Sequence, residues 1–172
     1  MALRFIVSDA ENLAGFTTAA ALQQYQKLAC QADAVALGHT SLWAHHLSDF
    51  GTAYTDYAFV IDTLLKDNQK SSIRSKPDIV VTRPGGSLTV NNDLVTFEFQ
   101  GFPNLQSGIT YLQFLQYIPE TFAYQAVDAF STLVAIGNNW VVARRSSAVA
   151  VPGLTRGVLE ASVGNWLTFC KK

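Results

Sequence analysis

Apolar side chains recur every three to five residues along the first third of the chain, with polar side chains between them. Over 9–37 this spacing begins at Ser8-Asp9-Ala10-Glu11, which has the S-x-x-E pattern of a helix capping box. Gly38 is suited to the C′ position that ends a helix. The pattern therefore predicts an amphipathic helix over about 9–37.

A second run with the same spacing extends from about Ser41 to Lys66. Its apolar stripe consists of Trp43, Leu47, Phe50, Tyr54, Tyr57, Ile61 and Leu64/Leu65. This run predicts a second long helix, antiparallel to the first. Residues 9–66 would then form a helical hairpin.

The periodicity changes after the polar segment 67–77. Residues 78–82 are rich in β-branched side chains, and Pro84-Gly85-Gly86 predicts a turn in which glycine adopts positive φ. The runs 87–90 and 94–99 flank Asn91-Asn92-Asp93, and apolar and polar residues alternate from 95 to 99. This part of the chain predicts a small antiparallel sheet with a hairpin.

The last third mixes both patterns. The spacing over 109–118 favours a helix, although its aromatic residues are also compatible with a strand. Pro119 suits the first position of a helix that ends near Gly137 and Asn138-Asn139. Short strands are expected at 140–143 and 148–151, and a final helix from Leu154 to Leu167.

Together these elements predict an α+β fold with a mainly helical core and a small antiparallel sheet. We expect a single domain over 1–172, with the helical hairpin at about 9–66, an exposed basic connection at 67–77 and a mixed strand and helix part at 78–172. At 172 residues the chain is long enough to bury one sizeable core.

Charge is unevenly distributed. Only 15% of residues are charged, and no Lys or Arg occurs between Pro84 and Ala143. Glutamine, asparagine, serine and threonine replace charged residues over much of this stretch, which is also rich in aromatic residues. Interfaces between identical subunits have a similar composition at their centres. The stretch therefore predicts a surface that packs against copies of the same chain.

Lysine and arginine gather on both sides of that stretch. Clustered guanidinium and ammonium groups suit contacts with the phosphates of RNA or DNA. A solvated basic face is the simpler interpretation, and an acidic protein surface is a third. The candidate nucleic-acid-binding residues are Lys66, Lys70, Arg74, Lys76, Arg83, Arg144 and Arg145, with Arg156 near the second group.

No motif for catalysis, phosphate binding or a cofactor is present, so we predict no catalytic residues and no cofactor. His39, His45 and His46 lie close together, and His45 would share a helix face with Asp49. A metal site needs a third ligand that the neighbouring sequence does not supply in a known spacing, so no metal is expected either.

The two cysteines are too few for a disulfide framework. Cys30 is expected to be a buried, inert thiol in a reducing compartment. The N-terminal residues lack the long apolar region of a signal peptide, and no run reaches about 18 apolar residues, so neither secretion nor membrane insertion is expected.

The leading hypothesis is a self-assembling structural subunit, such as a coat, capsid or tube protein. It would be cytoplasmic or part of an assembled particle such as a virion, and would bind copies of itself and an RNA or DNA backbone. The alternative is a protein or enzyme that binds a small apolar ligand in an aromatic-lined cavity. The lining residues in that case would be Trp43, Tyr54, Tyr57, Phe97 and Trp140.

Overall fold

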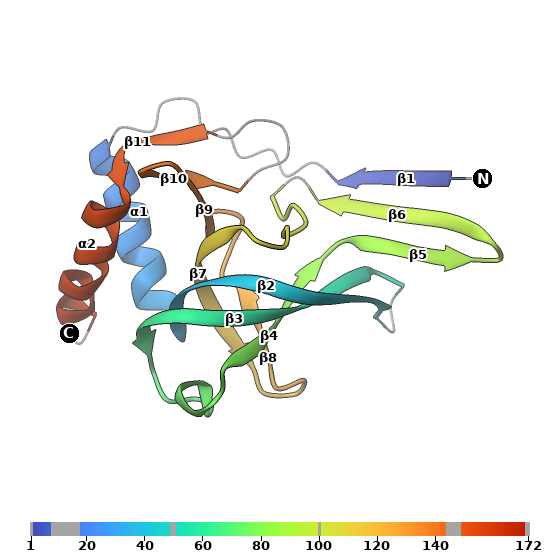
Figure 1. Cartoon of the computed structure of the whole chain (residues 1–172), viewed down its shortest axis with the longest axis horizontal. Coiled ribbons are helices and arrows are strands. Elements are labelled where there is room, and N and C mark those ends of the chain that lie inside the picture. Colours follow the sequence, from blue (N-terminus) through green and yellow to red (C-terminus); the bar gives the residue numbers. More distant parts are fainter. Residues whose placement is uncertain (1, 8–17, 49–50, 100, 144–148, 171–172) are drawn as a thin grey trace.

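The fold is known from a computed structural model, which describes residues 2–7, 18–48, 51–99, 101–143 and 149–170. It is mostly β, with a closed five-stranded barrel, a layer of two short helices and a projecting three-stranded sheet (Figure 1). The predicted α+β fold with a helical core is therefore wrong. The predicted capping box, Ser8 to Glu11, lies outside the described residues.

The barrel is formed by β2 (Ala34–Leu47), β3 (Ala53–Asp67), β4 (Asp78–Pro84), β8 (Ala123–Ala126) and β7 (Thr110–Ile118). It closes because β7 pairs with β2 through its first half and with β8 through its second half. Register shifts along β2, after Val35, Leu37 and Thr40, mark bulges that bend this long strand around the barrel.

The strands β9 (Thr132–Ile136), β10 (Asn139–Val142) and β11 (Val149–Thr155) extend the sheet beyond β7. The helices α1 (Thr18–Gln31) and α2 (Arg156–Phe169) lie side by side at this end (Figure 1). Tyr25, Leu28, Leu159 and Val163 of the helices share one buried cluster with Trp140 of β10.

The predicted second helix, 41–66, is the antiparallel hairpin of β2 and β3. Its residues alternate in burial from Ala53 to Phe59, with the odd-numbered residues buried. The aromatic and threonine content of the run suits strands, and the helical spacing of its apolar residues was coincidental. Gly38, expected to end the first helix, lies within β2.

The structure contradicts two more helical predictions and confirms most of the strands. The segment 119–137 forms β8 and β9, and 109–118 forms β7. The predicted strands at 78–82, 140–143 and 148–151 correspond to β4, β10 and β11. The final helix is confirmed as α2, where Thr155 accepts a hydrogen bond from the backbone of Val158 as its N-cap. A short 3₁₀ turn, Ile73–Ser75, lies in the predicted connection.

Candidate functional site

A projecting feature of the fold is an arm, which we define as the sheet of β1 (Ala2–Val7), β6 (Asp93–Phe99) and β5 (Gly86–Val90), in that order. It projects from the barrel on the side opposite the helices (Figure 1). Val90 and Leu94, close to its tip, are 44% and 49% exposed. Among the described elements outside the arm, β2 and β3 make the principal contacts with it, through β5. Its outer end therefore projects away from the other described elements (Figure 1).

The hairpin between β5 and β6 forms as its sequence predicts. Val90 pairs with Asp93, so Asn91 and Asn92 make a two-residue loop, and both have positive φ. This is the geometry of a type I′ turn, whose twist matches that of the flanking strands. The parallel strand β1, which pairs residue by residue with β6, was not predicted.

The arm leaves the barrel at the predicted turn, Gly85-Gly86, where both glycines have positive φ. Thr55 Oγ1 donates to the carbonyl of Gly85 at 2.8 Å. Because the Thr55 hydrogen is used in that bond, the 2.7 Å contact between His45 Nδ1 and Thr55 Oγ1 requires His45 to be the donor. Burial lowers the pKa of His45, which favours the neutral ring at this anchor.

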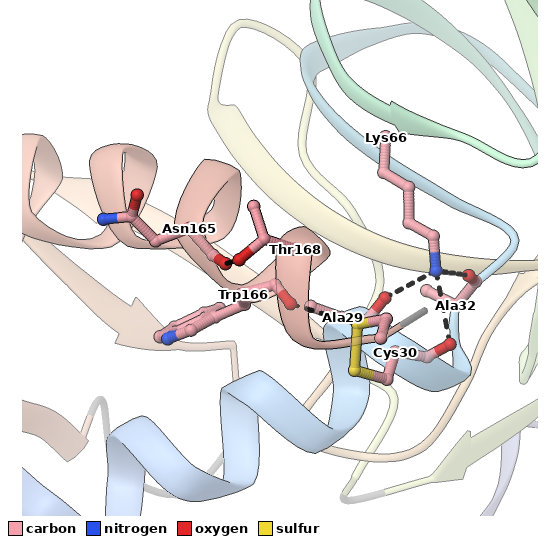
Figure 2. Close-up of a disulfide and its surroundings, with 8 residues drawn as sticks. Ala29, Cys30, Ala32, Lys66, Asn165, Trp166 and Thr168 are labelled. Atoms are coloured by element: carbon pink, nitrogen blue, oxygen red, sulfur yellow. Dashed lines mark hydrogen bonds between the residues drawn. A yellow bond between two sulfur atoms is a disulfide. The ribbon is translucent and has the colours of Figure 1, made fainter. Parts of the chain in front are cut away.

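The predicted nucleic-acid-binding residues are used in several different ways, and Lys66 is the clearest case. Its Nζ donates to the carbonyls of Ala29, Cys30 and Ala32 at 2.7, 3.2 and 2.7 Å (Figure 2). An ammonium group has three hydrogens, so these carbonyls at the end of α1 occupy all of them. Lys66 thus caps α1 by satisfying carbonyls that the helix leaves unpaired.

Cys30, in the same turn of α1, forms a disulfide with Cys170 just after α2 (Figure 2). The expectation of a buried free thiol is therefore wrong, and Cys30 is exposed. The prediction of a reducing compartment loses the observation on which it rested. The two helices are joined at their C-terminal ends by this bond.

Two more of the predicted basic residues, Lys70 and Arg74, form ion pairs. Lys70 Nζ lies 2.9 Å from the buried carboxylate of Asp33, and Arg74 Nε lies 2.7 Å from Asp67. Burial acts to raise the pKa of Asp33, but hydrogen bonds from Lys70, the Tyr117 backbone and Asn68 outweigh it and lower that pKa. Lys76 is exposed, and Arg144 and Arg145 lie outside the described residues.

Arg83 differs from all of these because it is 2% exposed and points into the barrel. Its Nη1 donates to Thr132 Oγ1 at 2.6 Å, and the ring of Phe102 lies 5.6 Å from its guanidinium carbon. Burial lowers its pKa to about 10, so it remains charged at neutral pH. No carboxylate pairs with it among the described residues.

A loop closes the barrel next to Arg83, and two barrel tyrosines hold it in place. The backbone N–H of Leu105 donates to the Tyr57 hydroxyl at 3.2 Å, and that of Gln106 donates to the Tyr111 hydroxyl at 2.8 Å. Burial raises the pKa of both phenols, so they are neutral at pH 7 and do not balance the charge of Arg83. We call the segment 102–106 the barrel loop.

The histidines do not form a metal site. Within the ranges that the structure describes, no group of three His, Cys, Asp or Glu side chains could hold an ion. His39 and His46 instead lie 3.3 and 3.4 Å from Asp62 and Asp56 on the neighbouring strand. His45 is on the strand β2 and not on the predicted helix, and Asp49 lies outside the described residues.

The aromatic residues proposed as a common cavity lining are not brought together. Tyr57 is inside the barrel, whereas Trp140 is in the cluster beneath the helices. Phe97 lines a cavity at the base of the arm, and Tyr54 stacks on His46. Nothing is described of the Trp43 side chain.

Sequence reasoning missed the polar groups inside the barrel, namely Gln113 and Thr132 beside Arg83. A signal was present, because Arg83 continues the alternation of Ile79 and Val81 on the buried face of β4. Gln113 likewise lies between the buried Tyr111 and Leu115 on β7. Reading 109–118 as a strand would have placed Gln113 in the interior.

The sequence matches no protein-family model, and comparisons with curated proteins and with solved structures found no match either. Neither helix of the described chain is long and apolar enough to cross a membrane.

Proposed function

We propose that this protein is a self-assembling structural subunit that pairs with a second copy of itself through the arm. The observation that carries this proposal is the β5 edge of the projecting sheet, which pairs with no further strand among the described residues and ends in the exposed Thr89 and Val90. An unpaired strand edge presents N–H and C=O groups that another strand can bind. The coat or tube role predicted from composition is one form that such association would take.

The chemistry of the two arm edges favours β5 as the pairing edge. Residues 86–90 contain no charged side chain, whereas β1 carries Arg4 in its sequence. Charges on an edge strand discourage pairing. Two β5 strands brought together antiparallel would be related by a twofold axis, so each copy would present the same surface to the other. The exposed Thr89 and Val90 at the end of β5 would then lose part of their contact with water.

Nucleic-acid binding stays a separate prediction. The ammonium of Lys66 and the guanidinium of Arg83 donate hydrogen bonds within the fold. Lys70 and Arg74 are in ion pairs. A phosphate-binding surface would use the exposed Lys70, Arg74 and Lys76, while Arg144 and Arg145 lie outside the described residues. The proposal of association through the arm does not depend on them.

Sedimentation velocity over a range of concentrations tests the association. The wild type is expected to form dimers or larger species, and the double variant Thr89→Lys/Val90→Lys is expected to stay a monomer of 18.8 kDa. Ile136→Lys is the matched control, since Ile136 is 52% exposed but lies on β9. A monomeric wild type would overturn the proposal, and so would a double variant that associates as the wild type does.

A further inference from the structure

The polar groups inside the barrel leave a set of buried hydrogen-bonding atoms without partners. Arg83 Nε and both side-chain polar atoms of Gln113, Nε2 and Oε1, are buried and make no hydrogen bond with the described residues. Leaving such groups unpaired costs about 1–3 kcal/mol each, and more for a charged group. Two side chains that carry this cost together on one inner surface point to a ligand.

Thr132 places the two side chains next to each other. Thr132 Oγ1 accepts the hydrogen bond from Arg83 Nη1, and Thr132 is the direct cross-strand partner of Gln113. Directly paired residues on neighbouring strands point to the same face, with Cβ atoms about 5 Å apart. The guanidinium of Arg83 and the amide of Gln113 therefore lie close together on the inner face of the barrel.

The donors and acceptors define the kind of ligand. A guanidinium with a free Nε–H edge matches the two oxygens of a carboxylate. The Gln113 amide adds one donor for an anionic oxygen and one acceptor that requires a hydroxyl or amino group. A small carboxylic acid with a hydroxyl or amino group on the neighbouring carbon satisfies both residues at once.

Access is through the barrel loop. A cavity of about 330 Å³ at the base of the arm is lined by Phe102, Asn104 and Gln106 of this loop, together with Phe97 and Phe99 of β6. The ring of Phe102 lies over the guanidinium of Arg83, so it separates this cavity from Arg83. Movement of Phe102 is therefore the entry route that the proposal requires.

We propose that Arg83, Gln113 and Thr132 form a binding site for the carboxylate of a small hydroxy or amino acid, which enters past Phe102. The site is independent of the proposed association through the arm. Arg83 binds the carboxylate through its Nε edge, Gln113 binds the carboxylate and the neighbouring hydroxyl or amino group, and Thr132 holds Arg83 in position.

Binding is tested with the full chain and three probes at millimolar concentration and constant ionic strength: sodium glycolate, sodium acetate and inorganic phosphate. A ligand of the folded state raises the unfolding temperature in proportion to its affinity. Glycolate is expected to raise it most and acetate less. A response to phosphate alone would overturn the assignment of a carboxylate, and no response to any probe would overturn the site.

Variants then locate the site. Arg83→Met should weaken glycolate binding about 100-fold and Gln113→Leu about 10-fold, because charged hydrogen bonds contribute more than neutral ones. The controls are Arg74→Met and Gln116→Leu, both exposed, the latter on the same strand as Gln113. Unchanged binding in Gln113→Leu would contradict the proposal even if Arg83→Met failed to fold. So would a glycolate titration of the wild type that leaves the ¹⁵Nε resonance of Arg83 unmoved.

Discussion

At the scale of single residues, His45 is expected to make the stability of the fold depend on pH, because its neutral ring donates a hydrogen bond where the arm leaves the barrel. Its folded pKa is lowered by burial, so the unfolded state, with a pKa of about 6.5, binds the proton more readily. The stability that depends on neutral His45 is therefore complete above about pH 6.5 and is lost as the pH falls through the lower folded pKa. We expect the free energy of unfolding in urea to decrease between pH 7 and pH 5.

His45→Asn is the matched variant for this prediction. An asparagine amide can donate to Thr55 Oγ1 from nearly the same place as the imidazole Nδ1 but does not titrate. The variant should therefore show a smaller loss of stability over the same pH range. If wild type and variant have the same pH dependence, His45 does not contribute to it.

Individual residues also show what the sequence could and could not reveal about the candidate site. The clustering of lysine and arginine was visible, but their partners were not, because those come from distant parts of the chain. Lys66 caps a helix that ends 35 residues earlier, and Arg83 meets Thr132 across the barrel. The clustering of lysine and arginine in the sequence therefore predicted one binding surface, whereas in the fold these residues cap a helix, form ion pairs or lie inside the barrel.

At the scale of elements, sequence patterns predicted correctly those turns and helices whose structure depends on neighbouring residues. The turn at Asn91-Asn92 and the helix α2 were predictable because turn geometry and helix periodicity depend on neighbouring residues. The hairpin of β2 and β3 was not, because its residues fit both a helical and an alternating pattern. Barrel closure through β7 and β8 and the parallel pairing of β1 depend on contacts that no short window contains.

Gly38 provides a test of the strand assignment. A Cβ at this position would lie 2.0 Å from the carbonyl oxygen of Val60 and 2.9 Å from the ring of Phe59. Gly38→Ala is therefore expected to lower the free energy of unfolding by about 1–3 kcal/mol or more, as overpacking does. At the C′ position of a helix, Gly38 would have a positive φ, and alanine would destabilise the fold through backbone strain. In β2 the φ of Gly38 is not positive, so the expected cost comes from close packing.

Gly164→Ala is the control for that substitution. Gly164 lies in α2, and a Cβ there would meet nothing within 4 Å. Alanine should raise the free energy of unfolding by up to about 1 kcal/mol, because it has the higher helix propensity. Urea unfolding of both variants measures the contrast, and an equal effect of the two would show that close packing at Gly38 is not decisive.

At the scale of the whole molecule, two buried clusters share the β-sheet as a common wall. One lies inside the barrel, and the other lies between the sheet and the helices. Leu112 and Phe114 of β7 face the helices, while Tyr111 and Leu115 face the barrel interior. Strand β7 therefore packs against both clusters. We expect the helix layer and the barrel to unfold in one cooperative transition.

The disulfide between Cys30 and Cys170 is what holds the ends of those helices together. It joins residues 140 positions apart, so it restricts the unfolded chain over most of its length. The double variant Cys30→Ser/Cys170→Ser is expected to lose about 3–5 kcal/mol of unfolding free energy, measured by urea denaturation. Reductant should lower the stability of the wild type to that of the double variant and leave the double variant unchanged. Equal stability of the oxidised wild type and the double variant would mean that Lys66 and the buried cluster hold the helices without the bond.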